Sequence, residues 1–367
     1  MTINAGSIRL GRHSSPAIIA TALAGLLTLA STAQDDGQEY RILKVGGTES
    51  IAGYLTSWID VSPDGSTVGL SATQGFPYRL FPASDEAQVR TIDVENWYAG
   101  SRARFSSTGR YILLQQLFYL DYAPNKDRPI KYEVVDVTTG KAVFSMDELY
   151  AAALTPDETT VVTLGKEGLH LVDLASGKRS SAGLERTGNA VAVSRNGQRI
   201  AVAHKPTKTE LEALTGLRND KDALKNALKV GQLVTVYDLA TLKPLHTLDE
   251  LFDKIFRLEY SPDGQDLWIH AKPHTRKGGN PNPNQCYVSV ADARTGAMRR
   301  TAFPSLAQYE PDFRISADGK LFAIGSQGNK FMEVHLYERA TGRMVDRFVL
   351  SYRLFEKMAS KAEFPSD

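Results

Sequence analysis

The chain has 367 residues, and its 43 Lys and Arg nearly balance its 42 Asp and Glu, which gives a formal net charge of +1. Such a chain has no general positive field that would attract nucleic acid, so we expect no nucleic-acid partner. Hydrophobic residues make up 42% of the sequence, which is ordinary for a globular protein. The single cysteine, Cys286, cannot form an internal disulfide, and this excludes a fold held together by cross-links.

The N-terminus has the pattern of a secretory signal peptide. Arg9 and Arg12 precede an apolar stretch at residues 17–30, and small residues follow up to Ala33. Because this stretch is too short to span a bilayer comfortably, we expect a signal peptide over residues 1–33, cleaved after Ala33. An uncleaved N-terminal anchor is the alternative. The mature chain would be periplasmic or secreted with a formal charge of −1, and no later stretch of it is apolar enough for a membrane span.

A short turn occurs six times along the rest of the chain, each time after an apolar, strand-like run. Most copies resemble Ser-Pro-Asp-Gly, in which Pro presets the backbone, Asp or Asn caps the turn, and Gly takes the left-handed position. A second turn follows in five units, and two hairpins per unit predict four antiparallel strands. Glu158 and Leu242 replace turn glycines, so we expect those two turns to be looser. The six turns start 39 to 67 residues apart, at Ser62, Ser106, Thr155, Ser194, Ser261 and Ser316.

This pattern resembles the WD-repeat and YVTN-type β-propellers over about residues 40–350, although the Gly-His and Trp-Asp dipeptides of eukaryotic WD repeats are absent. The resemblance implies an all-β fold, a β-propeller of six four-stranded blades within a single domain over residues 34–367. Seven blades is the alternative, and the seventh would use residues 40–45 and the tail from Ser351. The predicted repeats span about residues 54–94, 98–147, 149–183, 188–249, 255–303 and 310–350.

The fourth repeat contains an insertion of a different kind. Residues 209–229 are rich in Leu, Glu, Lys and Ala, and they predict a short helical hairpin within 207–230. Thr209 and either Asn219 or Asp220 are the expected N-caps. Longer connections occupy the same place in the second and fifth repeats, at residues 119–131 and 274–285. Insertions confined to one rim often mark the binding face of a repeat protein, whereas three neutral loop expansions are the alternative.

The first strand of each repeat suggests a polar central channel. In each repeat, the residues one and three positions before the start of the turn are apolar. Strand alternation sends the residues two and four positions before the turn to the opposite face of the strand, and we expect that face to line the channel. The arginines could hold a carboxylate or phosphate in the room left by the alanines, with Trp58 as a stacking surface. The alternative is a water-filled channel whose charges pair with one another. The nearer row is Asp60, Arg104, Ala153, Ala192, Glu259 and Arg314, and the farther row is Trp58, Arg102, Ala151, Ala190, Arg257 and Asp312.

Three histidines offer a weaker hypothesis for a metal site. His204, His270 and His274 come from adjacent repeats and could share a metal ion, but no carboxylate at ligand spacing completes the set. A chance cluster is the alternative. The sequence has no Gly-x-Ser-x-Gly elbow, no haem-attachment motif and no Gly-rich phosphate loop.

These observations favour a binding function over catalysis. We predict no catalytic residue and no cofactor, and we expect a monomer. Its insertion-bearing face and channel mouth would bind a protein partner or a small polar or anionic ligand. The alternative is a hydrolase resembling the lactonase propellers, which would use polar channel residues such as Glu259 and Asp312.

Overall fold

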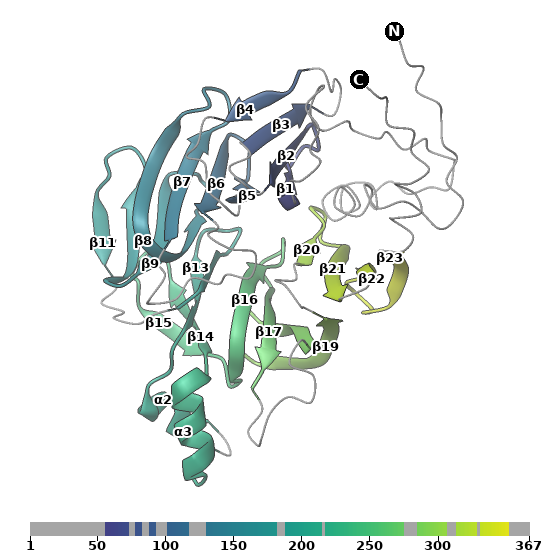
Figure 1. Ribbon diagram of the computed structural model, residues 1–367. Coiled ribbons are helices and arrows are strands. Elements are labelled where there is room, and N and C mark those ends of the chain that lie inside the picture. The colour runs from purple at the N-terminus through teal and green to yellow at the C-terminus, as the bar shows by residue number, and fades with distance from the viewer. Residues whose placement is uncertain are drawn as a thin grey trace.

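The computed structural model describes residues 56–72, 78–82, 88–92, 101–116, 130–181, 188–214, 217–274, 285–306, 313–328 and 331–351. The expected signal peptide, residues 40–45 and the tail beyond Ser351 lie outside the described residues. The described chain is largely β-strand, and its sheets are arranged side by side around a common centre (Figure 1). The expectation of an all-β fold is therefore confirmed.

Four of the sheets contain four antiparallel strands each, paired in sequence order as successive hairpins. The first is formed by β1 (Thr56–Val61), β2 (Thr67–Ala72), β3 (Tyr78–Pro82) and β4 (Arg90–Ile92). Three further sheets consist of β12 (Ala190–Val193), β13 (Arg199–His204), β14 (Leu233–Asp238) and β15 (Pro244–Thr247); β16 (Phe252–Tyr260), β17 (Asp266–Pro273), β18 (Gln285–Asp292) and β19 (Met298–Leu306); and β20 (Phe313–Ile315), β21 (Leu321–Gly328), β22 (Phe331–Glu338) and β23 (Met344–Ser351).

The second and third repeats form one continuous sheet of seven strands. Its longest strand, β8, serves both repeats, because residues 142–149 pair with β7 and residues 149–154 pair with β9. The repeat boundary expected near residue 148 therefore falls inside β8, at Glu148, whose φ is 59°. The seven strands are β5 (Ser101–Phe105), β6 (Tyr111–Gln116), β7 (Ile130–Asp136), β8 (Ala142–Leu154), β9 (Thr160–Gly165), β10 (Gly168–Asp173) and β11 (Arg179–Ser181).

The repeated turn has the same hydrogen bonds in different units. Ser62 Oγ donates to Asp64 Oδ1 at 2.6 Å and accepts from Thr67 N at 2.9 Å. The Ser261 and Ser316 hydroxyls make the equivalent pair of bonds in their own turns. The turn residues thus satisfy one another locally, which explains why Ser, Asp and Gly recur together.

The two turns without glycine keep this conformation, so the expectation that they would be looser is wrong. The φ angle is 61° at Glu158 and 55° at Leu242. In the first type of turn, Glu158 N donates at 2.9 Å, as Gly65 N does. In the second type, Leu242 N donates to Asp238 O at 2.9 Å, as Gly140 N does to Asp136 O at 2.8 Å. A left-handed backbone costs an ordinary residue about 1–2 kcal/mol. Both side chains make contacts between neighbouring repeats that offset this cost: Glu158 accepts from Thr108 N at 2.8 Å, and Leu242 is buried in a cluster with Leu169.

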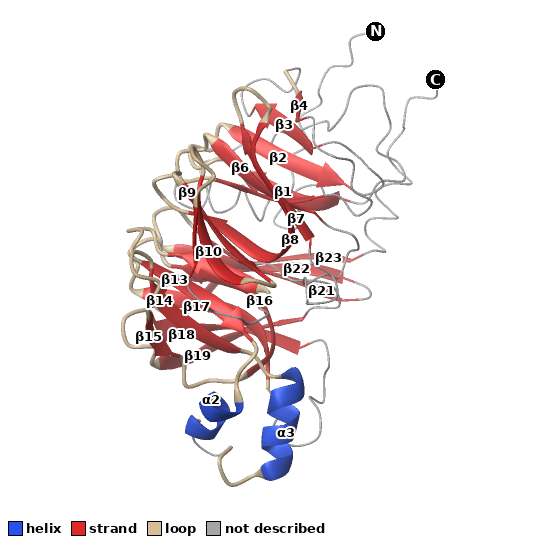
Figure 2. Ribbon diagram, turned by 90° about the vertical axis from the view of Figure 1, so that its left-hand side faces the viewer, coloured by secondary structure: helices blue, strands red, loops and turns tan. Residues whose placement is uncertain are grey.

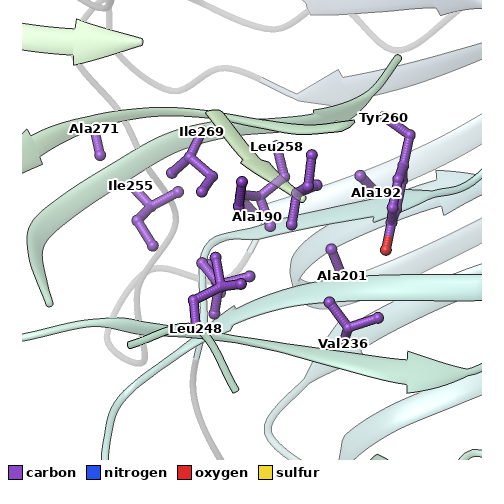
Figure 3. Close-up of a cluster of buried hydrophobic side chains, with 14 of the residues drawn as sticks. Ala190, Ala192, Ala201, Val236, Leu248, Ile255, Leu258, Tyr260, Ile269 and Ala271 are labelled. Atoms are coloured by element: carbon purple, nitrogen blue, oxygen red, sulfur yellow. The ribbon is translucent and has the colours of Figure 1, made fainter. Parts of the chain in front are cut away.

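Neighbouring sheets bury their faces against each other. Figure 3 shows the interface where the β12–β15 sheet meets the β16–β19 sheet, with Ala190 and Ala192 on one side and Ile255 and Leu258 on the other. The small side chains of β12 leave room for the larger ones of β16. An aromatic cluster centred on Trp268 joins the β16–β19 and β20–β23 sheets in the same way. Stacking of this kind is what a repeat fold needs, because one sheet cannot bury its own faces.

Two short helices, α2 (Lys208–Ala213) and α3 (Lys221–Val230), lie between β13 and β14, inside the segment for which the sequence predicts them. They project beyond the sheets at one end of the molecule (Figure 2). Leu211 and Leu217 of the helical segment pack with Leu251, which anchors it to the sheets. Neither of these helices has the length and apolarity needed to cross a membrane. The other two expected insertions, 119–131 and 274–285, lie largely outside the described residues.

The helix caps differ in part from those expected. Thr207, rather than Thr209, is the N-cap of α2: its hydroxyl accepts from Glu210 N at 3.3 Å, and the Glu210 carboxylate accepts from Thr207 N at 2.7 Å. Asp220 caps α3 by accepting from Ala223 N at 2.9 Å. The reciprocal bonds of Thr207 and Glu210 form a capping box, which fixes the start of α2 two residues earlier than predicted.

Candidate functional site

A pocket lies where the first strands of four consecutive repeats converge. Side chains of β5, β8, β12 and β16 line it, and β6 and β7 complete its wall. The pocket has a cavity volume of about 50 Å³ and is partly open to solvent.

The residues expected four positions before the turn form much of the pocket. Arg102, Ala151, Ala190 and Arg257 all line it, and they come from the second to the fifth repeats. From the nearer row only Arg104 joins them. The structure thus brings the arginines and the alanines of the farther row together. Trp58 belongs to β1, but its side chain and the whole of Asp312 lie outside the described residues.

Several residues of the nearer row make contacts between repeats. Asp60 Oδ2 accepts from Phe105 N at 2.9 Å, and Asp60 Oδ1 lies 3.5 Å from Arg314 Nη2. Ala192 packs in the apolar cluster between β12 and β16. The reason is geometric, because a strand with a sheet on each side sends both of its faces into interfaces. Asp60 and Arg314 thus form an ion pair with each other.

The polar part of the lining is positively charged. Among the described residues, three arginines and no acidic side chain line the pocket. Arg257 is only 5% exposed, and its guanidinium pairs with Glu259 on the same strand and lies 5.2 Å from the centre of the Phe313 ring. These two contacts fix the position of the Arg257 side chain. A partly enclosed site of this charge favours a carboxylate or phosphate, which guanidinium groups bind through paired hydrogen bonds.

The apolar part of the lining comes mainly from β16 and β12. Phe256 and Leu258 lie on β16, and Val191 lies on β12. Phe256 is the extra residue of a β-bulge. Ile255 pairs with Ala271 and Arg257 pairs with His270, so two steps along β16 match a single step along β17. A bulge redirects the side chains around it, and here Phe256 and Arg257 both reach the pocket.

Sequence reasoning missed several lining residues, among them Asn189 and Phe256. These two stand five positions before their turns, one position beyond the rows that the sequence alignment compared. The bulges of β1 and β8 fall at the same position, at Ser57 and Tyr150. Extending the alignment by one residue would have found both positions. The bulge itself depends on how β16 pairs with β17, and strand alternation does not predict it.

The three histidines are not assembled into a metal site. One His204 ring nitrogen lies 2.8 Å from Thr235 Oγ1 and the other lies 2.9 Å from a backbone carbonyl oxygen, so both are engaged. His274 Nδ1 pairs with Asp253, and the His270 ring lies against two phenylalanine rings. Within the part of the chain that the structure describes, no group of three or more His, Cys, Asp or Glu side chains is placed to hold a metal ion.

Comparison with known proteins identifies the fold. No protein-family model matches the sequence, and no curated protein sequence matches it either. Among solved structures, hydrazine synthase from Kuenenia stuttgartiensis is similar with a TM-score of 0.55 and 14% identity, covering 83% of this chain and 90% of that one. The Cps50 (Swd1) β-propeller domain from Myceliophteria thermophila is similar with a TM-score of 0.53 and 13% identity, covering 81% and 88%. With four-stranded antiparallel sheets around a common centre, the described chain has a β-propeller fold.

Proposed function

We propose that this protein is an exported, monomeric β-propeller of the WD-repeat or YVTN type that binds a small anionic ligand in its central pocket. The observation that carries the proposal is that the described part of the pocket lining contains three arginines and no acidic side chain. The five sheets support a six-bladed ring, because the seven-stranded sheet contains the strands of two repeats and β8 belongs to both of them. Export is supported by the signal-like pattern at residues 1–33, and an N-terminus at Gln34 in the mass of the purified mature protein would test it.

The binding proposal is tested by removing one guanidinium while keeping most of the side-chain volume. Arg102→Gln in the mature chain should weaken the binding of a small carboxylate or of inorganic phosphate, measured by titration calorimetry. A hydrogen bond to a charged group contributes about 1.5–3 kcal/mol, so we expect about a 10- to 100-fold loss of affinity.

The matched control is Arg195→Gln, because Arg195 is exposed in the turn of the fourth repeat. This change removes the same charge far from the pocket lining and should leave the affinity unchanged. If the two variants bind equally well, the pocket is not the anion site. If neither the parent protein nor any variant binds a carboxylate or phosphate, the proposed function is wrong.

The helical insertion is a second candidate binding surface, for a protein partner. Leu228 is 38% exposed on α3, on the same side of the helix as Lys221 and Lys225, which are also exposed. A partner that binds the Arg102→Gln variant normally but no longer binds after residues 207–230 are replaced by a short linker would favour this surface. The hydrolase alternative has less support, because Glu259 is engaged by Arg257.

A further inference from the structure

The outward side of α3 carries a stripe of lysines. Lys221, Lys225 and Lys229 are all exposed and stand four residues apart, so they follow one side of the helix along its length. At a rise of about 1.5 Å per residue, this lysine stripe is about 12 Å long. Lys205 adds a further charge at the C-terminal end of α3, because its Nζ donates to the backbone oxygen of Lys229 at 3.1 Å.

The acidic side chains of the helical insertion are largely engaged within it. The Glu210 carboxylate closes the capping box of α2, Glu212 pairs with Lys208 at 3.5 Å, and Asp220 caps α3. Among the residues that the structure describes, no carboxylate lies within ion-pair distance of the lysine stripe. Like charges four residues apart destabilise a helix, so the stability of α3 does not explain the stripe.

Apolar side chains flank the C-terminal end of the stripe. Leu228 is 38% exposed and Val230 is 39% exposed, whereas Ala223 and Ala227 form the buried side of α3. The helices project beyond the sheets, so the outward side of α3 is open to a large molecule (Figure 2). This basic surface with a small apolar contact fits a protein better than a lipid bilayer, because an interfacial helix needs a broad apolar face to enter the bilayer.

We propose that the lysine stripe and Leu228 bind an acidic helix of a partner protein. This inference rests on the second candidate surface of the proposed function, and it does not depend on the central pocket. Glutamates four residues apart on the partner helix would match the spacing of the lysines, and an apolar residue beside them would cover Leu228. Complementary charge of this kind speeds association and selects against basic partners.

The test measures the fluorescence anisotropy of a labelled synthetic helical peptide that has Glu at every fourth position and Leu beside each Glu. This peptide should bind the mature parent protein, and raising the salt concentration should weaken the binding. Each exposed ion pair contributes little, so we combine Lys221→Gln, Lys225→Gln and Lys229→Gln in one variant and expect about a tenfold loss of affinity. A peptide with Gln in place of every Glu should not bind the parent protein.

The matched control removes the same charge elsewhere. It combines Lys141→Gln, Lys166→Gln and Lys178→Gln, at exposed positions of the second and third repeats, and it should bind the peptide as the parent protein does. The inference is overturned if the two triple variants bind the peptide equally well, or if the peptide does not bind the parent protein. It is also overturned, in favour of a membrane surface, if the parent protein binds phosphatidylglycerol vesicles but not the peptide.

A titration of the stripe variant with inorganic phosphate separates this inference from the anion site in the pocket. The variant keeps all the pocket arginines, so it should bind phosphate as the parent protein does. Loss of peptide binding with phosphate binding intact therefore supports the inference, whereas loss of both in this variant would contradict a docking surface that is independent of the pocket.

Discussion

Replacing Leu242 by glycine tests whether contacts between repeats offset the strain of a left-handed turn residue. Glycine adopts this backbone freely, so the change should recover about 1–2 kcal/mol. Against this, Leu242 is only 9% exposed and packs in a cluster that joins the third and fourth repeats. Losing a buried leucine side chain costs about 2–5 kcal/mol. We therefore expect Leu242→Gly to lower the free energy of unfolding by about 2 kcal/mol.

Glu158→Gly provides the matched comparison, because its φ of 61° is close to the 55° of Leu242. It recovers the same backbone strain but loses only hydrogen bonds that are exposed, such as the one from Thr108 N. Glu158 accepts from three donors. Because these bonds are exposed, we take the lower end of about 0.5–1.5 kcal/mol for each, so their loss nearly cancels the recovered strain. The difference between the two variants is free of the backbone contribution and measures the buried side chain.

The assay is equilibrium unfolding in urea, followed by the fluorescence of the three tryptophans. Leu245→Ala serves as the control, because Leu245 is 50% exposed and its truncation should change stability by less than about 0.5 kcal/mol. The reasoning is refuted if Leu242→Gly is at least as stable as the parent protein, or if Glu158→Gly is the less stable of the two.

Three further predictions concern the turns, an aromatic cluster and the cysteine. Hydrogen bonds from Ser62 and Ser66 lower the pKa of Asp64 from 3.8 to about 2. The stability that the Asp64 carboxylate contributes is therefore present above about pH 4 and is lost as the pH falls toward 2. A free energy of unfolding that stays constant between about pH 4 and 2 would contradict this prediction. Phe322 is fully buried in the aromatic cluster around Trp268, so Phe322→Ala should lower the free energy of unfolding in urea by about 3–5 kcal/mol. A loss below about 1 kcal/mol would mean that this cluster does not join the β16–β19 and β20–β23 sheets. Burial raises the pKa of the Cys286 thiol to about 11. The thiol of the native protein should therefore resist alkylation near neutral pH and react only in concentrated urea. Rapid alkylation of the native protein would disprove this prediction.

The turns and the strands around them could be predicted because their causes are local. Four of the six turns are closed by a hydroxyl, a carboxylate and a left-handed residue within a few positions, and the sequence displays all three. The capping box of Thr207 and Glu210 was equally local and was readable as Thr-x-x-Glu. Choosing Thr209 as the cap overlooked a signal that the sequence contained.

What could not be predicted depends on how distant segments pair. The continuity of β8 follows from a change of partner at residue 149, from β7 on one side to β9 on the other. The sequence shows only that residues 142–154 contain no glycine or proline to break the strand. Similarly, the paired state of Asp60 depends on Phe105 and Arg314, which come from repeats on either side of it.

The position four residues before the turn explains why one region of the centre is hollow. In the second and fifth repeats it is Arg102 and Arg257, and in the third and fourth it is Ala151 and Ala190. Four alanines would leave no donors for an anion, whereas four arginines would fill the space and repel one another. Two long charged side chains and two minimal ones leave both volume and hydrogen-bond donors. Glu259 and the Phe313 ring hold the Arg257 guanidinium in place. On the proposed function, ordering this side chain would therefore add little to the cost of binding.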